Sequence, residues 1–355
     1  MKAALLGMMQ SGKSTLISAV SGRPPAPSGT QEIHEVMVPV PDERLDWLTS
    51  LYKPAKTVPA AIDCLDLPGL NFMDEHGRAA ARRLFGQIRT ADLFVVVLRA
   101  FENEAVPAYR NRVDPRKDLE ELKTELLLAD LELVTTRIDR LQKQMNKPTK
   151  TQARDKEELA LQYKLQQILE SEKPLSSADL SSNELELIKS LGFLTLRPML
   201  IVVNVGENQL AQPMDLGKAA GDAEVICLSA EIESELAQLD PDSRAEFMKD
   251  LGISKPASVQ FVQSCYRTLG LISFLTVGKD EVRAWPIRAG ISAHEAAGKV
   301  HSDIQRGFIR AETMAFADLR QLGDEKAVKA AGKMRLEGKN YIVQDGDIIC
   351  FRFNV

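Results

Sequence analysis

The sequence predicts an α/β protein with a mostly parallel sheet, an inserted α-helical coiled-coil arm and a small C-terminal domain of β-grasp type. Three observations predict this architecture. A glycine-rich phosphate-binding motif occupies residues 7–15, between a strand-like and a helical segment. Strand-like and helical segments alternate over residues 1–110 and resume near residue 199. A charged stretch with a helical period separates these two parts, over residues 116–190.

The first element is the phosphate loop (P-loop), Gly7-Met8-Met9-Gln10-Ser11-Gly12-Lys13-Ser14-Thr15, which matches Gly-x4-Gly-Lys-Ser/Thr. An apolar strand over 2–6 leads in and a helical stretch over 15–20 follows, so backbone N–H groups and a helix N-terminus would face an anion. Gly7 and Gly12 permit the tight wrap, Lys13 would approach the β- and γ-phosphates, and Ser14 would ligate Mg2+. A chance glycine turn is the alternative, which the flanking strand and helix disfavour.

Further strands are predicted at about 35–40, about 58–66 and 92–98, the last being apolar throughout, as in a strand buried on both faces. The third ends in Asp66-Leu67-Pro68-Gly69, where P-loop proteins hold a Mg2+-bound water with the Asp and offer the glycine N–H to the γ-phosphate. A plain strand-ending turn is the alternative. Thr30 lies in a loop-like stretch where a switch threonine would complete the Mg2+ ligands, although a solvated hydroxyl fits its position equally well.

The charged stretch carries a heptad-like seam, with apolar residues spaced four and three apart at Leu127, Leu131, Val134, Ile138, Leu141 and Met145. A second stripe follows the Asn146-Lys147-Pro148 break. Two antiparallel helices forming a projecting arm are the simplest interpretation, and a helical subdomain flat against the core is the alternative.

Strands return at 199–204 and 224–229, and each is followed by candidate residues for the base. Asn204-Val205-Gly206-Glu207 stands where GTP-specific proteins carry Asn-Lys-x-Asp, so Val205 replaces the lysine and Glu207 the aspartate. The longer carboxylate predicts relaxed or adenine-preferring recognition. Ser229-Ala230 would offer backbone groups to the base edge, and a strand-end turn is the alternative role for Asn204.

The last element group begins near residue 272, where two strands, a helix and mixed segments ending at 347–353 suit a β-grasp-like domain. Residues 273–355 hold 13 Lys/Arg against 11 Asp/Glu, whereas the preceding residues carry a net charge of −7. A weakly positive module on an acidic body is compatible with RNA contact. The predicted domains are thus 1–115 with 198–271, 116–197, and 272–355.

Composition excludes other classes. The chain has 355 residues, 44% of them hydrophobic, with a net charge of −5. No apolar run approaches the roughly 20 residues that a membrane span requires. The chain opens directly into a strand, so we expect no signal peptide. Four cysteines without a Cys-x-x-Cys motif indicate reduced, buried thiols in a cytoplasmic protein, and no histidine cluster suggests zinc.

Taken together, these residues resemble the YchF-type Obg-like ATPases over nearly the whole chain. The most specific stretches are Val38–Asp46, Tyr52-Lys53-Pro54, Ser229–Leu236, Val282-Arg283-Ala284-Trp285, Gly307–Glu312, Arg335–Lys339 and Tyr341–Asp347. The resemblance implies an Obg-like nucleotide domain, a coiled-coil insertion and a C-terminal TGS domain. It also implies ATP in preference to GTP, association with ribosomes, and the switch-I role for Thr30.

The chain departs from that family at three places, namely the P-loop, the Asn71–Arg83 stretch and Ala108. Met9-Gln10-Ser11 replace Pro-Asn-Val in the P-loop, and Asn71–Arg83 retains only Gly77 and favours helix where the family is glycine-rich. Leu70 follows the glycine where Ras-like GTPases place a water-orienting glutamine, and a hydrophobic residue there is itself a family trait. Ala108 stands where the family carries a histidine proposed to assist hydrolysis. His76 is a candidate substitute, although a lone loop histidine is usually only solvated.

Two functions remain open on this basis. One is a slow, Mg2+-dependent ATPase with weaker GTP activity near the ribosome, in which Lys13, Thr30, Asp66 and Gly69 stabilise charge on the phosphates without a protein general base. The other is a nucleotide-binding adaptor that hydrolyses little and presents its arm and TGS domain to RNA or ribosomal protein. Leu70, Ala108 and the altered switch favour the adaptor, but we expect the ATPase with slow intrinsic turnover, since groups supplied by a partner can restore the rate.

Overall fold

The computed structural model describes the chain except residues 25–31, 146–151, 211–213, 254 and 355. The chain divides into two compact units: residues 1–36 with 63–258, and residues 37–62 with 259–355. No helix of the described part is both long and apolar enough to cross a bilayer.

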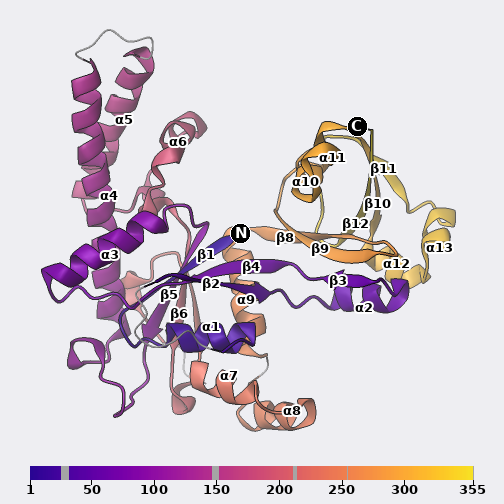
Figure 1. Cartoon of the computed structure of the whole chain (residues 1–355), viewed down its shortest axis with the longest axis horizontal. Coiled ribbons are helices and arrows are strands. Elements are labelled where there is room, and N and C mark those ends of the chain that lie inside the picture. The colour runs from indigo at the N-terminus through magenta and orange to yellow at the C-terminus, as the bar shows by residue number, and fades with distance from the viewer. Residues whose placement is uncertain (25–31, 146–151, 211–213, 254, 355) are drawn as a thin grey trace. The chain divides into compact units, whose positions relative to one another are not determined.

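The first unit contains a six-stranded sheet flanked by helices, except for residues 37–39 and 61–62 of that sheet, which fall in the second unit (Figure 1). Its spatial order is β2 (His34–Pro39), β4 (Ala61–Asp66), β1 (Lys2–Leu6), β5 (Leu93–Arg99), β6 (Met199–Asn204) and β7 (Glu224–Leu228). The strands from β4 to β7 pair in parallel, which confirms the predicted α/β class. β5 is buried at every residue, as its continuous apolar run predicts for a central strand.

Helices around this sheet are α1 (Lys13–Ser21), α3 (Glu75–Gln87), α7 (Ala230–Leu236), α8 (Pro241–Asp250) and the start of α9 (Ala257–Leu269). The register of the parallel strands places the strand-end residues Asp66 and Asn204 at the same edge of the sheet, because Leu5 lies opposite Asp66 and Arg99 lies opposite Asn204. The carboxyl ends of these parallel strands therefore hold the predicted site residues, as the topology of open α/β sheets requires.

The arm consists of α4 (Pro115–Met145) and α5 (Gln152–Glu170), which pack side by side (Figure 1). The predicted seam is confirmed, since Val134, Ile138 and Leu141 are buried and the first two form a core with Leu161 and Leu165 of α5. The N-terminal part of α4 instead packs its leucines into the core of the first unit. Helix α6 (Ser182–Ile188) and the 3-10 helix η4 (Leu194–Leu196) lead back to β6.

The second unit contains a mixed sheet in the order β11 (Arg335–Glu337), β10 (Phe308–Ala315), β12 (Asp347–Phe353), β8 (Leu271–Thr276), β9 (Glu281–Arg288) and β3 (Lys56–Val58). Its helices are α2 (Glu43–Tyr52), α10 (Ala293–Val300), α11 (Ser302–Arg306), α12 (Phe316–Leu322) and α13 (Glu325–Ala330). Alanines of α10 pack against Phe274, Phe308 and Ile349 of the sheet. The strand and helix order predicted for the C-terminal domain is therefore present.

Two predictions require correction. The single strand expected over about 58–66 is two strands, β3 and β4, which belong to different sheets. Pro59 lies between them and has no N–H to continue a ladder. The expectation that all thiols are buried is wrong for Cys350, which is exposed on β12, and for Cys227, which is only partly buried.

Candidate nucleotide-binding site

The phosphate loop connects the buried strand β1 to α1, and Gly12 is the N-terminal cap of that helix. Gly12 has a left-handed backbone with φ 89°, and a Cβ there would lie 2.1 Å from Nδ2 of Asn204. Only glycine fits this combination of conformation and space. The local fold is therefore the strand–loop–helix geometry that presents backbone N–H groups to an anion.

Lys13 is 5% exposed and donates from Nζ to the carbonyl oxygens of Gly7 (2.9 Å) and Met8 (3.1 Å). Burial lowers the pKa of Lys13 to about 8, and the charge of Asp66 acts in the opposite direction. A buried ammonium whose donors rest on carbonyls of its own loop is well prepared to exchange them for phosphate oxygens.

Asp66 ends β4 and is 4% exposed. Burial raises its pKa, whereas a hydrogen bond from the Ser14 side chain and the charge of Lys13 lower it. Its Oδ1 is buried without a hydrogen-bond partner. A serine hydroxyl beside a carboxylate with an unused oxygen suits a hard divalent cation, whose remaining ligands are usually water and phosphate. Three predicted site residues, Lys13, Ser14 and Asp66, are therefore brought together.

The segment after Asp66 is attached to the phosphate loop through its backbone. The N–H of Leu70 donates to the Gly7 carbonyl (3.0 Å), and the N–H of Met9 donates to the Leu70 carbonyl (3.1 Å). Gly69 lies so close that a Cβ would be 2.7 Å from Cα of Met9. The Leu70 side chain is 1% exposed and belongs to the apolar core with Met8, so it does not face the phosphate loop's outer surface.

The Asn204 side chain forms hydrogen bonds both to the phosphate loop and to the Ser229-Ala230 segment, the second candidate for contacting the base. Its Nδ2 donates to the Ser11 carbonyl (3.1 Å), and its Oδ1 accepts from the N–H of Ala230 (3.0 Å). Ser229 caps α7, its Oγ accepting from the N–H of Ile232. The Ala230 N–H therefore reaches a base only by sharing or opening its bond to Asn204.

Val205 and Glu207 have separate environments. Val205 is 2% exposed and packs in the apolar core, so it cannot lie over a base as a lysine at this position would. Glu207 begins the 3-10 helix η5 (Glu207–Gln209), and its carbonyl accepts from the Leu210 N–H (3.3 Å). Its side chain is exposed and forms no hydrogen bond or ion pair within the described residues. Of the remaining predicted residues, Met9, Gln10 and Thr15 are exposed on the phosphate loop, and Thr30 falls outside the described residues.

Two aromatic side chains near the site were missed by sequence reasoning. The ring of Phe101 lies 3.8 Å from where a Cβ on Gly12 would be, and the guanidinium of Arg99 stacks on that ring at 4.4 Å. Tyr109 is buried beside the segment that follows Gly69. The available signal for Phe101 was its place just beyond the end of the buried strand β5, whereas no motif marks Tyr109.

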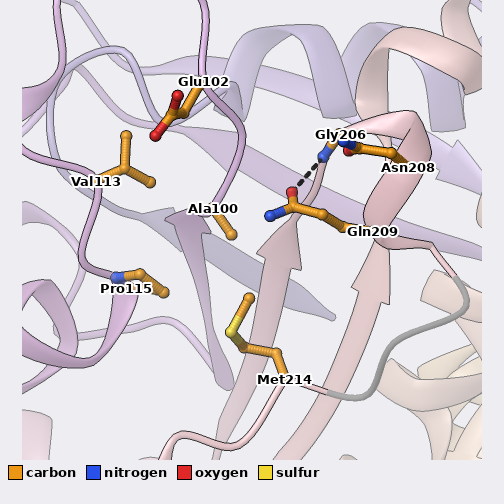
Figure 2. Close-up of a pocket in the computed structure, with 8 residues that line it drawn as sticks. All are labelled: Ala100, Glu102, Val113, Pro115, Gly206, Asn208, Gln209 and Met214. Carbon is orange, nitrogen blue, oxygen red and sulfur yellow. Dashed lines mark hydrogen bonds between the residues drawn. The ribbon is translucent and has the colours of Figure 1, made fainter.

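A cavity of about 410 Å3 opens between the loop after β5 and the loop after β6 (Figure 2). It is lined by Ala100, Glu102, Val113, Pro115, Gly206, Asn208, Gln209 and Met214. The Gly206 N–H donates to Oε1 of Gln209 at 3.0 Å, which fixes the turn after β6. None of the predicted site residues in the described part of the chain lines this cavity.

The fold and this loop geometry define a phosphate-loop nucleotide-binding protein. A family model described as "50S ribosome-binding GTPase" matches residues 2–136, and another described as "YchF-GTPase_C: Protein of unknown function (DUF933)" matches residues 271–354. The chain is 41% identical over 365 aligned positions to the ribosome-binding ATPase YchF of Bacillus subtilis (strain 168), covering 99% of each protein. It is 38% identical to Obg-like ATPase 1 of Oryza sativa subsp. japonica, covering 100% of this chain and 92% of the relative.

The solved structure of the Schizosaccharomyces pombe YchF GTPase superposes with a TM-score of 0.83 at 31% identity, covering 99% of this chain and 97% of that one. The chain therefore belongs to the YchF family.

Proposed function

We propose that this chain is a slow, Mg2+-dependent ATPase that acts on or near the ribosome. The observation that carries the proposal is the cluster of Lys13, Ser14 and the under-bonded Asp66 carboxylate beside a loop that can wrap phosphates. The relatives named ribosome-binding ATPase support both the reaction and the partner.

Each residue of the cluster has a distinct proposed role. Lys13 binds the β- and γ-phosphates, the Gly69 N–H donates to the γ-phosphate, and the N–H groups of Gly7 to Thr15 surround the rest. Ser14 and Thr30 ligate Mg2+, and Asp66 holds one of its water ligands. When bound, the ion neutralises charge that develops on the phosphate oxygens.

Slow turnover follows from what the site lacks. The Leu70 side chain lies in the core, and the Ala108 side chain has no hydrogen-bonding group. The His76 side chain is exposed in the first turn of α3 and forms no hydrogen bond or ion pair among the described residues. Because none of these three side chains is placed to orient the attacking water, we expect catalysis to depend on positioning and electrostatics.

The proposed base preference is ATP over GTP. The Asn204 amide is engaged at both ends, Val205 is buried, and Glu207 is a longer carboxylate than the aspartate that pairs with guanine. These three features remove the specific recognition of guanine N1 and N2 without building a barrier to adenine.

The test is a titration of ATP, GTP and a non-hydrolysable ATP analogue in Mg2+, followed by phosphate release with and without ribosomes. We expect tighter binding of ATP than of GTP, and slow release that ribosomes accelerate. Lys13→Ala should abolish binding of each nucleotide. Equal affinities for ATP and GTP would contradict the role given to Glu207, and absence of phosphate release under every condition would exclude the ATPase.

The absence of release would instead support a nucleotide-binding adaptor. The specific observation in its favour is that the altered switch is an ordered helix, α3, with Asp74 accepting from the Gly77 N–H (2.7 Å) at its N-terminus. In either case we propose that the arm and the C-terminal domain, as a TGS domain, contact RNA or ribosomal protein in the cytoplasm. Salt-dependent binding of ribosomal RNA by the intact chain would support this.

A further inference from the structure

Tyr109 lies in the loop between β5 and α4, immediately after Ala108. Its side chain is 5% exposed and shares an apolar core with Met8, Leu70 and Phe72. The Tyr109 hydroxyl accepts a hydrogen bond from the backbone N–H of Phe72 at 3.2 Å, and this bond is buried. A side chain from one loop thus holds the backbone of another.

The backbone that Tyr109 holds is the segment Gly69–Phe72, which follows the Asp66 carboxylate. Its first half is attached to the phosphate loop by the two hydrogen bonds that join Leu70 to Gly7 and Met9. Tyr109 supplies the attachment of its second half. The segment is therefore held at Leu70 and at Phe72, and Gly69 lies directly before the first of these two attachments.

The loop that carries Tyr109 is itself firmly built. The buried Arg99 guanidinium donates to the carbonyl oxygens of Phe101 (3.1 Å), Val106 (2.9 Å) and Pro107 (3.3 Å), which shapes residues 101–107 from inside. Directly after Tyr109, Arg110 and Asn111 both adopt left-handed backbone with φ 53°. Such conformations are costly for residues other than glycine and persist where surrounding contacts over-determine them.

We propose that Tyr109 is a positioning residue for hydrolysis, whose hydroxyl sets Gly69–Phe72 and through it the approach of the Gly69 N–H to the γ-phosphate. This inference rests on the proposed ATPase function. Neighbouring Ala108 and Leu70 offer no polar side chain to the reaction, so its rate depends on backbone groups being held in place. Burial raises the pKa of Tyr109, so the hydroxyl stays neutral and can accept from an N–H at physiological pH.

The test compares Tyr109→Phe, which removes only the hydroxyl, with Tyr163→Phe as the matched control. Tyr163 lies on α5 and its hydroxyl accepts from Nε2 of Gln142 at 2.7 Å, so the control also deletes one hydrogen bond but in the arm. We expect kcat for ATP to fall about tenfold in Tyr109→Phe. The affinity for ADP should remain within about twofold, since ADP lacks the phosphate that Gly69 would contact.

A merely structural role would lower ATP and ADP affinity together, and that result would overturn the inference, as would an unchanged kcat. A second measurement separates this inference from the proposed ATPase function. It is the ratio of the affinity for a non-hydrolysable ATP analogue to the affinity for ADP, which reports the contact with the γ-phosphate without requiring hydrolysis. If the unmutated chain released no phosphate, the ATPase would be excluded, yet the ratio should still fall in Tyr109→Phe. An unchanged ratio would then dismiss the positioning role as well.

Discussion

Lys13 combines deep burial with a charge that the site requires. Its donors lie on the carbonyl oxygens of Gly7 and Met8, and burial brings its pKa down to about 8. A triphosphate beside it adds negative charge, which favours the protonated form and raises the pKa again. Nucleotide binding and protonation of Lys13 are therefore linked.

This linkage predicts proton uptake when MgATP binds at pH 8. A group with a pKa of about 8 is half protonated there, so binding should take up about half a proton, falling to about a tenth at pH 7. Calorimetry in buffers of different ionisation enthalpy measures the uptake directly. Proton release at pH 8, or equal uptake at both pH values, would contradict the proposed contact between Lys13 and the phosphates.

Gly12 provides a second residue-scale prediction. Gly12→Ala would place a Cβ 2.1 Å from Nδ2 of Asn204 at a left-handed φ, which should displace Asn204 from the Ser11 carbonyl and distort the loop. We expect ADP affinity to fall at least about tenfold, a change of about 1.4 kcal/mol. Gly22→Ala is the control, because Gly22 also has positive φ (67°) but open space around it. Gly22→Ala should lose about 1 kcal/mol of stability and keep its affinity for ADP. Equal ADP affinities in Gly12→Ala and Gly22→Ala would contradict the explanation that a Cβ at Gly12 displaces Asn204.

Several elements could be predicted from residue patterns, and the exceptions have physical causes. The apolar run of β5 and the seam of α4 were recognisable because their environment is set by local sequence period. β3 was not recognisable as a separate strand. Its partner, β9, lies more than 200 positions later in the chain, and a strand of three residues is too short for its sequence to indicate which sheet it joins. Within the site, Lys13 and Asp66 follow motifs, whereas Tyr109 acts through one hydroxyl on a backbone N–H and leaves no motif.

At the scale of elements, the base of the arm depends on Asp130 of α4. This carboxylate is fully buried and accepts from Nη1 of Arg89 (3.0 Å) and from the N–H groups of Leu194 (3.0 Å) and Thr195 (2.8 Å). It thereby joins the segment after α3, the arm and η4. Removing one partner of a buried pair leaves the other charge uncompensated.

Asp130→Asn should therefore destabilise the first unit by about 3–5 kcal/mol, measured as the free energy of unfolding in urea. The control is Glu132→Gln, two positions along α4, whose ion pair with Arg82 is solvent-exposed and should contribute no more than about 1 kcal/mol. Similar losses of unfolding free energy in both variants would mean that the buried Asp130 contributes no more to stability than the exposed Glu132.

For the molecule as a whole, the composition of the second unit matters most. Residues 37–62 lie in sequence between Thr30 and Asp66, yet they fold with residues 259–355. Arg44 of α2 forms an ion pair with Asp345 (2.8 Å), Trp47 packs edge-on against Phe316 with ring centroids 5.4 Å apart, and β3 extends the sheet beside β9. Most of the chain between the two candidate switch residues, residues 37–62, is thus part of the C-terminal unit.

Trp47→Ala should therefore loosen the second unit selectively. Loss of the aromatic pair removes about 0.5–1.5 kcal/mol in addition to buried area, so amide exchange in β9 and α12 should quicken about tenfold. Exchange in β5 and β6 should be unchanged, and Leu51→Ala, an exposed position on the same helix, should change neither. Hydrogen exchange followed by mass spectrometry reports each peptide separately. If β5 quickened as much as β9, residues 37–62 would belong energetically to the nucleotide-binding unit.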